Sequence, residues 1–293
     1  MTKQTVFRDY DQAGLDAQYN NRARFPDFVR HFESWSTWSA KTRATLPCRL
    51  DIPYGDTAPE KLDVFPAAEA DAPIYVFIHG GYWYSLDKSD YSYIAEGMRP
   101  HGVATAVINH GLAPAHDMDT IVAHSRRALA WLWRNAASFG ADASRIYICG
   151  HSAGGHLAMM LLATDWPALG TDLPGDIVKG VCPIGGIFDL EPIRLCYLNE
   201  KLHMDAAMAR RNSPMSVIYR YPAPMLLVIA IDESEEFHRQ SREMEAAWRA
   251  RGWPVELTVP QDLDHFSVVN DMIRPDCPIV LAQLDQMKLA FGR

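Results

Sequence analysis

The sequence is organised around a serine that stands between two glycines, in Gly150-His-Ser-Ala-Gly154. This pentapeptide follows a short apolar run at 146–149 and precedes an apolar helical pattern that extends to Thr164. A strand that enters a helix through G-x-S-x-G turns so tightly that the serine adopts strained backbone, and glycines two positions away avoid a clash. The pattern is common, so its weight depends on the surrounding elements. We expect Ser152 to stand at the end of a central strand.

The rest of the chain alternates strand patterns with helical patterns of ten to twenty residues. Strands are predicted at 48–52, 61–65, 74–78, 103–108, 146–149, 178–184, 225–231 and 255–259. This alternation predicts an α/β fold, with a mostly parallel central sheet and helices on both faces. Residues 191–222 interrupt the alternation and are expected to form a small helical cap. No linker or repeat divides the chain, so we expect a single domain over residues 1–293.

The N-terminal segment, residues 1–46, is predicted to be helical and unusually aromatic. Phe25, Phe28, Phe32 and Trp35 are spaced as one face of a helix, with Pro26 near its first turn. A helix this aromatic must bury that face. Two interpretations stay open, namely that the helix packs on the flank of the domain or that it roofs a substrate pocket.

A nucleophilic serine needs a base, and the loops that follow the late strands supply one. A histidine takes the proton of the hydroxyl, and a carboxylate orients the histidine. In one recurrent arrangement on parallel sheets the acid follows a late strand and the histidine follows the next strand. Asp232 ends the strand at 225–231, and His265 lies in the loop after 255–259. We therefore expect Ser152, His265 and Asp232 to act together.

Other residues compete for the roles of base and acid. His151 is held in the turn and His156 lies on the helix side, so His265 is the better base. The acid stays open among further carboxylates, and Asp232 is preferred because it is nearest to the strand end. The competing residues are Glu233, Glu235, Glu236, Asp189 and Asp264.

Acyl transfer also needs hydrogen-bond donors for the oxyanion, each worth about 3–4 kcal/mol of transition-state stabilisation. The amide of Ala153 follows the nucleophile and is one expected donor. The loop His79-Gly-Gly-Tyr-Trp83 follows a buried strand, and its Gly81 and Tyr82 amides are the other candidates. We expect His79 to brace this loop. Tyr82, Trp83, Phe188 and the aromatic N-terminal helix are the candidates to line a substrate pocket beside this loop, with Trp83 and Phe188 proposed to bind substrate.

Composition restricts the partners. The net charge of −8 provides no basic surface for nucleic acid or anionic membranes. No apolar run is long enough to span a bilayer, and the first ten residues lack a secretion signal. The five cysteines are odd in number and include no C-x-x-C pair, which favours free thiols and a cytoplasmic protein. We expect a small-molecule substrate and leave a homo-oligomer open.

No metal or cofactor is expected. The sequence has no H-E-x-x-H motif, and neither a phosphate loop nor a G-x-G-x-x-G dinucleotide loop occurs. Serine chemistry requires no cofactor.

Several longer motifs are more specific than the serine pentapeptide. They are Ile52-Pro-Tyr-Gly-Asp56, His79-Gly-Gly-Tyr-Trp83, Gly150-His-Ser-Ala-Gly-Gly-His156, Phe188-Asp-Leu-Glu-Pro-Ile193, Arg211-Asn-Ser-Pro214, Glu236-Phe-His-Arg-Gln-Ser241 and Asp264-His-Phe266. In these motifs the chain resembles the α/β hydrolases, and more narrowly the arylformamidases (kynurenine formamidases), a branch near the hormone-sensitive-lipase-like esterases. The H-G-G-x-W and E-F-x-x-Q-S patterns are characteristic of that branch. The acid loop 232–237 looks one residue longer than the family's.

The resemblance implies an α/β-hydrolase fold, the catalytic residues Ser152, Asp232 and His265, and hydrolysis of an aryl formamide such as N-formylkynurenine to the arylamine and formate. A carboxylesterase that acts on small-acyl esters is the alternative, since bacterial relatives with this pattern are often esterases. An alternative of another class is a non-catalytic ligand-binding protein with this fold.

Overall fold

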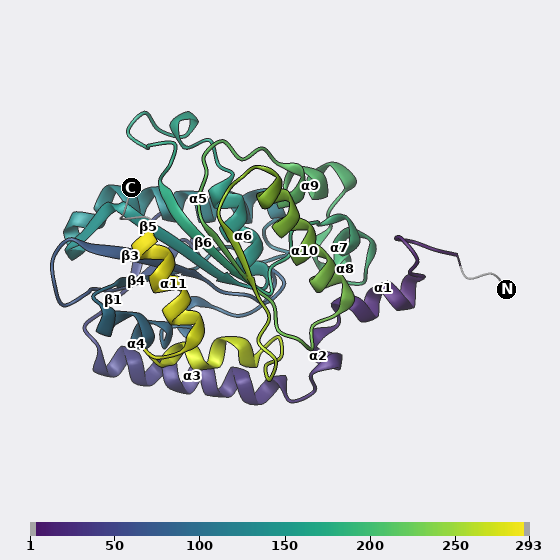
Figure 1. Ribbon diagram of the computed structural model, residues 1–293, viewed down its shortest axis with the longest axis horizontal. Helices are drawn as coiled ribbons and strands as arrows, with labels where there is room; N and C mark the ends of the chain where they lie inside the picture. The colour runs from purple at the N-terminus through teal and green to yellow at the C-terminus, as the bar shows by residue number, and fades with distance from the viewer. Residues whose placement is uncertain (1–3, 290–293) are drawn as a thin grey trace.

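An eight-stranded sheet forms the middle layer of the computed structural model, which describes residues 4–289 (Figure 1). The strands lie in the order β1-β2-β4-β3-β5-β6-β7-β8. β2 is antiparallel to β1 and to β4, and the six strands in the order β4-β3-β5-β6-β7-β8 are parallel to one another. The bounds are β1 Arg49–Pro53, β2 Lys61–Phe65, β3 Ala72–Ile78, β4 Ala104–Ile108, β5 Ala141–His151, β6 Val178–Ile184, β7 Met225–Val228 and β8 Val255–Thr258. The predicted mostly parallel sheet is confirmed.

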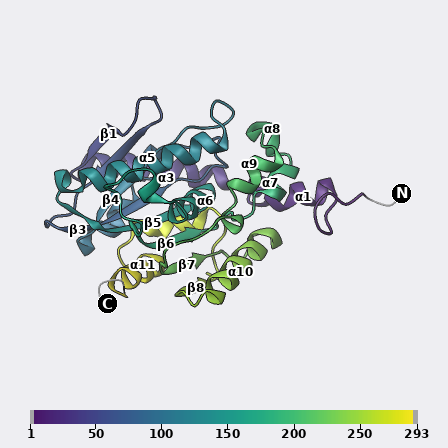
Figure 2. The same cartoon turned by 90° about the horizontal axis from the view of Figure 1, so that it is seen from above.

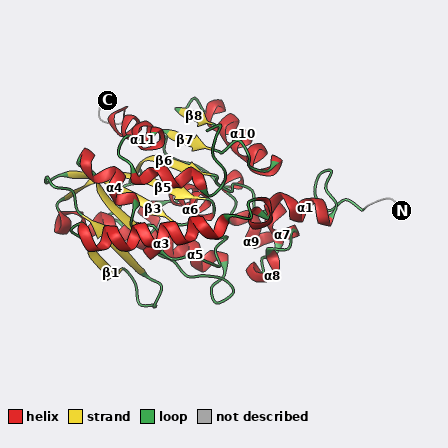
Figure 3. Cartoon of the chain, turned by 90° about the horizontal axis from the view of Figure 1, so that it is seen from below, coloured by secondary structure: helices red, strands yellow, loops and turns green. Residues whose placement is uncertain are grey.

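Both faces of the sheet are covered because its central strands are apolar on both sides. In β3, Ile74, Val76 and Ile78 face one core, whereas Tyr75 and Phe77 face the other. Figures 2 and 3 show the two helical layers. One contains α5 (Met118–Asn135), α6 (Ala153–Leu162) and α10 (Glu235–Ala250), and the other contains α3 (Phe28–Thr45), α4 (Ile94–Met98) and α11 (Pro278–Leu289). The α/β-hydrolase fold predicted from the sequence is confirmed.

Residues 191–222 contain three short helices that lie beside α1 (Gln12–Tyr19) at one end of the molecule (Figure 1). These helices are α7 (Glu191–Leu195), α8 (Asn199–Leu202) and α9 (Ala206–Arg211). Gln12 donates to the carbonyl of Leu195, and the amide of Tyr197 donates to Asp16. The insertion is therefore tied to the N-terminal segment.

The aromatic face of the N-terminal segment packs on Phe266, the residue after His265. Phe25, Phe28, Phe32 and Trp35 all have ring centroids within 6.4 Å of Phe266. The four rings do not belong to one helix, because α2 (Asn21–Arg24) ends before Pro26 and α3 begins at Phe28. This packing places the start of α3 next to the loop that carries His265.

Two global properties follow from the described residues. None of the helices within residues 4–289 combines the length and apolar character needed to cross a bilayer. All five cysteines are free thiols, and all but Cys48 are buried.

Candidate active site

Ser152 lies on a strained turn between β5 and α6. Its φ of 56° and ψ of −118° are unfavourable for a residue with a side chain. Two glycines make the turn possible, because a Cβ on Gly150 would clash with the carbonyl of Gly154, and a Cβ on Gly154 would clash with the carbonyl of Ile78. The amide of Ser152 donates to the carbonyl of Ile184 in the neighbouring strand, at 2.7 Å. The turn therefore holds the serine at the carboxyl edge of the sheet.

The loop that follows β3 turns three consecutive residues to positive φ. These are Gly81 (104°), Tyr82 (49°) and Trp83 (59°). Gly80 lets the loop approach the serine turn, since a Cβ there would lie 2.9 Å from the carbonyl of His151 and 3.1 Å from the Cβ of Ser152. No acceptor within residues 4–289 pairs with the amides of Gly81, Tyr82 or Ala153. These amides are available to an oxyanion, and their catalytic role stays a prediction.

The carboxylate beside His265 belongs to Glu233. Its Oε1 lies 2.6 Å from Nδ1 of His265, and both side chains are buried. Asp232, our preferred acid, is exposed in the preceding turn. The structure thus pairs His265 with Glu233 in place of Asp232, because strand β7 ends at Val228 and the turn from Ala230 to Glu233 brings the later carboxylate inward. The catalytic role of this carboxylate stays a prediction.

The other candidate carboxylates have different partners. Glu235 accepts from the hydroxyl of Tyr10, and Glu236 accepts from the hydroxyl of Tyr19. Asp189 accepts from the amide of Glu191. Asp264 accepts from the amides of Phe266 and Ser267, so it orders the loop next to the base.

Gly185 is a site residue that the sequence analysis missed. It follows β6 with a φ of 53°, and a Cβ there would lie 2.9 Å from Oε1 of Glu233 and 3.3 Å from Nδ1 of His265. Because glycine has no side chain, Glu233 and His265 have the space to form their hydrogen bond. The signal in the sequence was the pair Gly185-Gly186 directly after a buried strand.

His151 holds the main chain of His265 in place. Its Nε2–H donates to the main-chain carbonyl of His265 at 2.7 Å, and the two rings are 4.9 Å apart. Burial, followed by the neighbouring His265, lowers the pKa of His151 to about 3. His151 therefore stays neutral over the physiological range and acts as a donor to the loop that carries the base.

Trp83 and Phe188, which we predicted to bind substrate, are both completely buried in the core. Nε1 of Trp83 donates to Nδ1 of His156 at 3.2 Å, and Nε2–H of His156 donates to the carbonyl of Asn212 at 2.7 Å. Trp83 thus connects the loop after β3 to α6 and to the insertion, and does not line the cavity at Ser152. His79 braces the same loop as expected, with Nε2 3.0 Å from Oδ1 of Asn109.

A cavity of about 30 Å³ lies at Ser152. Three parts of the chain line it: the N-terminal helices, the loop after β3, and the loops that carry the serine and the base. Its lining residues are Asn21, Arg22, Phe32, Trp35, Gly81, Tyr82, Ser85, Leu86, His151, Ser152, His265 and Phe266. The structure therefore brings Ser152, His265, Gly81 and Tyr82 to one cavity, and the N-terminal segment both packs on the domain and roofs this cavity.

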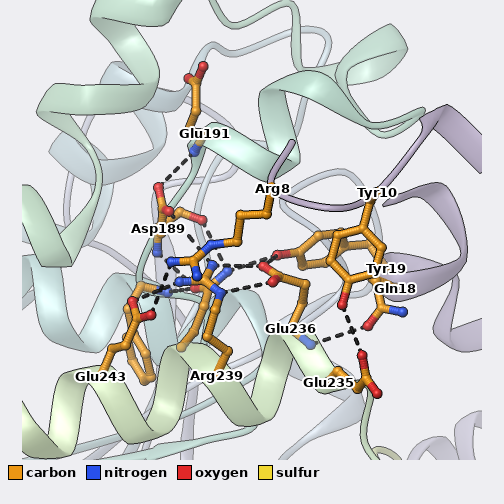
Figure 4. A network of polar contacts seen from close by, with 12 residues as sticks. Arg8, Tyr10, Gln18, Tyr19, Asp189, Glu191, Glu235, Glu236, Arg239 and Glu243 are labelled. Carbon is orange, nitrogen blue, oxygen red and sulfur yellow. Dashed lines mark hydrogen bonds and ion pairs between the residues drawn. The ribbon is translucent and has the colours of Figure 1, made fainter. Parts of the chain in front are cut away.

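A network of polar contacts fixes the N-terminal segment to α10 (Figure 4). Burial raises the pKa of Tyr19 well above its usual value, so its hydroxyl stays protonated. This hydroxyl donates to Glu236 at 3.1 Å and accepts from Nε2 of Gln240 at 2.9 Å. Arg239 forms two hydrogen bonds to Glu236, at 2.8 and 2.7 Å.

The same glutamine holds the loop after β6. Its Oε1 accepts from the amides of Phe188 and Asp189, at 2.6 and 2.8 Å. The E-F-x-x-Q-S motif of the sequence is therefore a positioning element, since Glu236 and Gln240 connect α1, α10 and the loop after β6.

A mostly parallel sheet with a serine on a strained turn, and in the same cavity a histidine that is paired with a buried carboxylate, is the arrangement of the α/β hydrolases. The protein is a hydrolase of the serine-hydrolase type. The chain belongs to the BD-FAE family, whose model matches residues 62–247.

Three comparisons illustrate the similarity. Kynurenine formamidase of Danio rerio is 31% identical over 265 residues, which cover 88% of this chain and 88% of that protein. A proposed thioesterase from Silicibacter sp. TM1040 superposes with a TM-score of 0.79 at 29% identity, over 91% of this chain and 97% of that one. Esterase B from Lactobacillus rhamnosis HN001 superposes with a TM-score of 0.69 at 17% identity, over 93% of this chain and 96% of that one. The last similarity is one of fold.

Proposed function

We propose that this hydrolase cleaves aryl formamides, such as N-formylkynurenine, into the arylamine and formate, with Ser152 as nucleophile, His265 as base and Glu233 as the acid that orients it. The cavity at Ser152 carries the proposal. A volume of about 30 Å³ holds about two water molecules, which favours a formyl group over a longer acyl chain. The kynurenine formamidase relative supports the same substrate class.

The mechanism begins with the proton of Ser152. His265 accepts this proton while the serine oxygen attacks the formyl carbon. Glu233, 2.6 Å from Nδ1, fixes the tautomer of His265 and stabilises the imidazolium. The amides of Gly81, Tyr82 and Ala153 donate to the oxyanion as it forms.

Collapse of the tetrahedral intermediate breaks the bond between the formyl carbon and nitrogen. His265 gives its proton to the departing arylamine and leaves a formyl ester on Ser152. Water then attacks this ester with His265 again as base, and formate leaves as the serine regains its proton.

Arg22 places a positive charge at the part of the cavity that the N-terminal segment lines. Its guanidinium lies 5.4 and 5.9 Å from the rings of Phe28 and Phe32 and donates to Oγ of Ser85 at 3.4 Å. A substrate that is an amino acid carries a carboxylate, for which a held guanidinium is a suitable partner. This favours a formylated amino acid over a neutral ester.

The test compares kcat/KM for N-formyl-L-kynurenine with kcat/KM for p-nitrophenyl acetate and butyrate. We expect the formamide to be preferred and the butyrate to be the poorest substrate. A butyrate ester cleaved faster than the formamide would contradict the proposal and favour a carboxylesterase. Ser152→Ala is the control, and it should abolish both hydrolysis and labelling by a fluorophosphonate.

A further inference from the structure

Asn21 is a buried polar residue at the cavity of Ser152. It is the first residue of α2 and is 2% exposed, yet neither its Oδ1 nor its Nδ2 has a hydrogen-bond partner within residues 4–289. It lines the cavity that Ser152 and His265 also line. The preceding Asn20 caps α2 by accepting from the amide of Ala23, so Asn21 is not needed for the cap.

Such an arrangement is unfavourable unless water or a ligand in the cavity completes it. Native proteins pair nearly all buried polar side-chain atoms, because an unpaired one loses its hydrogen bonds to water without replacement. The neighbouring backbone fixes Asn21 in place, since Tyr19 is anchored to Glu236 and Gln240, and the carbonyl of Asn21 accepts from Phe25 at 2.9 Å. A fixed and unpaired amide at the cavity is a binding group.

We propose that Asn21 makes the site selective for amides over esters, by accepting from the N–H of the scissile amide and donating to an adjacent acceptor of the leaving group. This inference rests on the proposed function and deepens it. An ester presents an oxygen where an amide presents an N–H, so an ester leaves the carbonyl of Asn21 unpaired. A site built to bind a donor discriminates strongly against an analogue that lacks it.

The substrate class follows from the two halves of the asparagine amide. The carbonyl of Asn21 requires a hydrogen-bond donor on the substrate, and its NH₂ group requires an acceptor a few bonds away from that donor. An aryl formamide with a carbonyl group ortho to its nitrogen presents both. Formanilide presents the donor alone, and phenyl formate presents neither partner in the required place.

The experiment measures kcat/KM for 2′-formamidoacetophenone, formanilide and phenyl formate, the last corrected for uncatalysed hydrolysis. In Asn21→Leu and Asn21→Ala we expect the ratio of formamide to formate ester to fall about 10- to 100-fold, as for the loss of one or two hydrogen bonds. The ortho-carbonyl substrate should lose more than formanilide. Asn135→Leu is the matched control, because Asn135 pairs with the carbonyl of Trp131 on α5, and its ratio should equal that of the native enzyme.

The Tm of the Asn21 variants distinguishes a binding role of Asn21 from a structural one. Replacing an unpaired buried amide by leucine removes a desolvation cost, so the Tm of Asn21→Leu should equal or exceed that of the native protein. A lower Tm with an unchanged ratio would overturn the inference and show a structural role. Failure of the proposed function is seen separately, as a native enzyme that cleaves phenyl formate and neither formamide.

Discussion

The hydroxyl of Tyr82 donates a 2.7 Å hydrogen bond to the main-chain carbonyl of Tyr19. This bond connects the loop that offers amides to the oxyanion with the segment that roofs the cavity. Tyr19 is in turn held by Glu236 and Gln240 on α10. The roof, the loop after β3 and α10 therefore form one connected unit, in which a change at Tyr19 reaches the cavity through both its hydroxyl and its backbone.

Tyr19→Phe should lower both stability and activity. The substitution removes the donor to Glu236 and leaves Gln240 Nε2 without that acceptor, which costs about 1–3 kcal/mol for buried groups. Thermal unfolding and kcat/KM for N-formyl-L-kynurenine measure the two effects. Tyr221→Phe, at an exposed tyrosine, is the control and should change neither. An unchanged Tyr19→Phe enzyme would show that the network does not position the roof.

Glu233→Gln should reduce kcat by about 10³- to 10⁴-fold, because a neutral amide neither stabilises the imidazolium nor selects the required tautomer of His265. Asp232→Asn is the matched control, since Asp232 is exposed one position earlier, and its kcat should stay within about twofold of native. Steady-state kinetics of both variants show which of the two carboxylates assists His265. A larger loss in Asp232→Asn would restore our original choice.

Gly185→Ala should impair catalysis beyond its effect on stability. The new methyl group would lie 2.9 Å from Oε1 of Glu233, so it would separate the acid from the base. We expect a decrease in kcat of about 10- to 100-fold, the loss caused by a misplacement of about 1 Å. Gly102→Ala has a similar positive φ of 75° and no atom within 4 Å of the new Cβ. It should cost about 1 kcal/mol of stability and leave kcat unchanged, whereas equal kinetics in the two variants would contradict the steric role.

Arg22→Ala should raise KM for N-formyl-L-kynurenine more than for formanilide, which has no carboxylate. Arg22 is exposed, so its charge-assisted hydrogen bond contributes about 1 kcal/mol, and we expect about a 5-fold difference between the two effects. Arg30→Ala, at an exposed arginine whose nearby carboxylate is Asp27, is the control. Equal effects of Arg22→Ala on both substrates would argue against recognition of a carboxylate.

Stability should fall in acid, partly through His156. Burial lowers its pKa to about 4, whereas the unfolded chain titrates near ~6.5. Between these values the unfolded state binds more protons, so the stabilising contribution is complete above about pH 6.5 and is lost as the pH falls toward 4. The shift corresponds to a loss on the order of 3 kcal/mol.

Denaturant unfolding from pH 7 to pH 4 measures this loss. His156→Gln cannot titrate, so its unfolding free energy should depend less steeply on pH than that of the native protein. His101→Gln, at an exposed histidine that contacts the carbonyl of Pro275, should retain the native slope. A native slope in His156→Gln would show that His156 is not the group responsible.

The sequence by itself determined the fold class and the elements that carry the chemistry. Local patterns suffice there, since an apolar strand that ends in Gly150-His-Ser-Ala-Gly154 allows few conformations, and the positions of the late strands place His265 at the same edge of the sheet. It also identified the loop 79–83, because two glycines after a buried strand suit a tight approach: Gly81 adopts a positive φ, and Gly80 lets the loop come close to the serine turn.

Only the tertiary structure decided which side chains meet. Asp232 and Glu233 are adjacent, but the turn after β7 exposes Asp232 and buries Glu233. The position of this turn depends on where β7 ends, and no local sequence pattern determines that end. Trp83 seemed suited to a substrate pocket but pairs with His156, a partner 73 positions away. Asn21 and Gly185 gained their significance through contacts between distant segments, because cavities and steric clearances depend on packing, which the order of residues along the chain does not reveal.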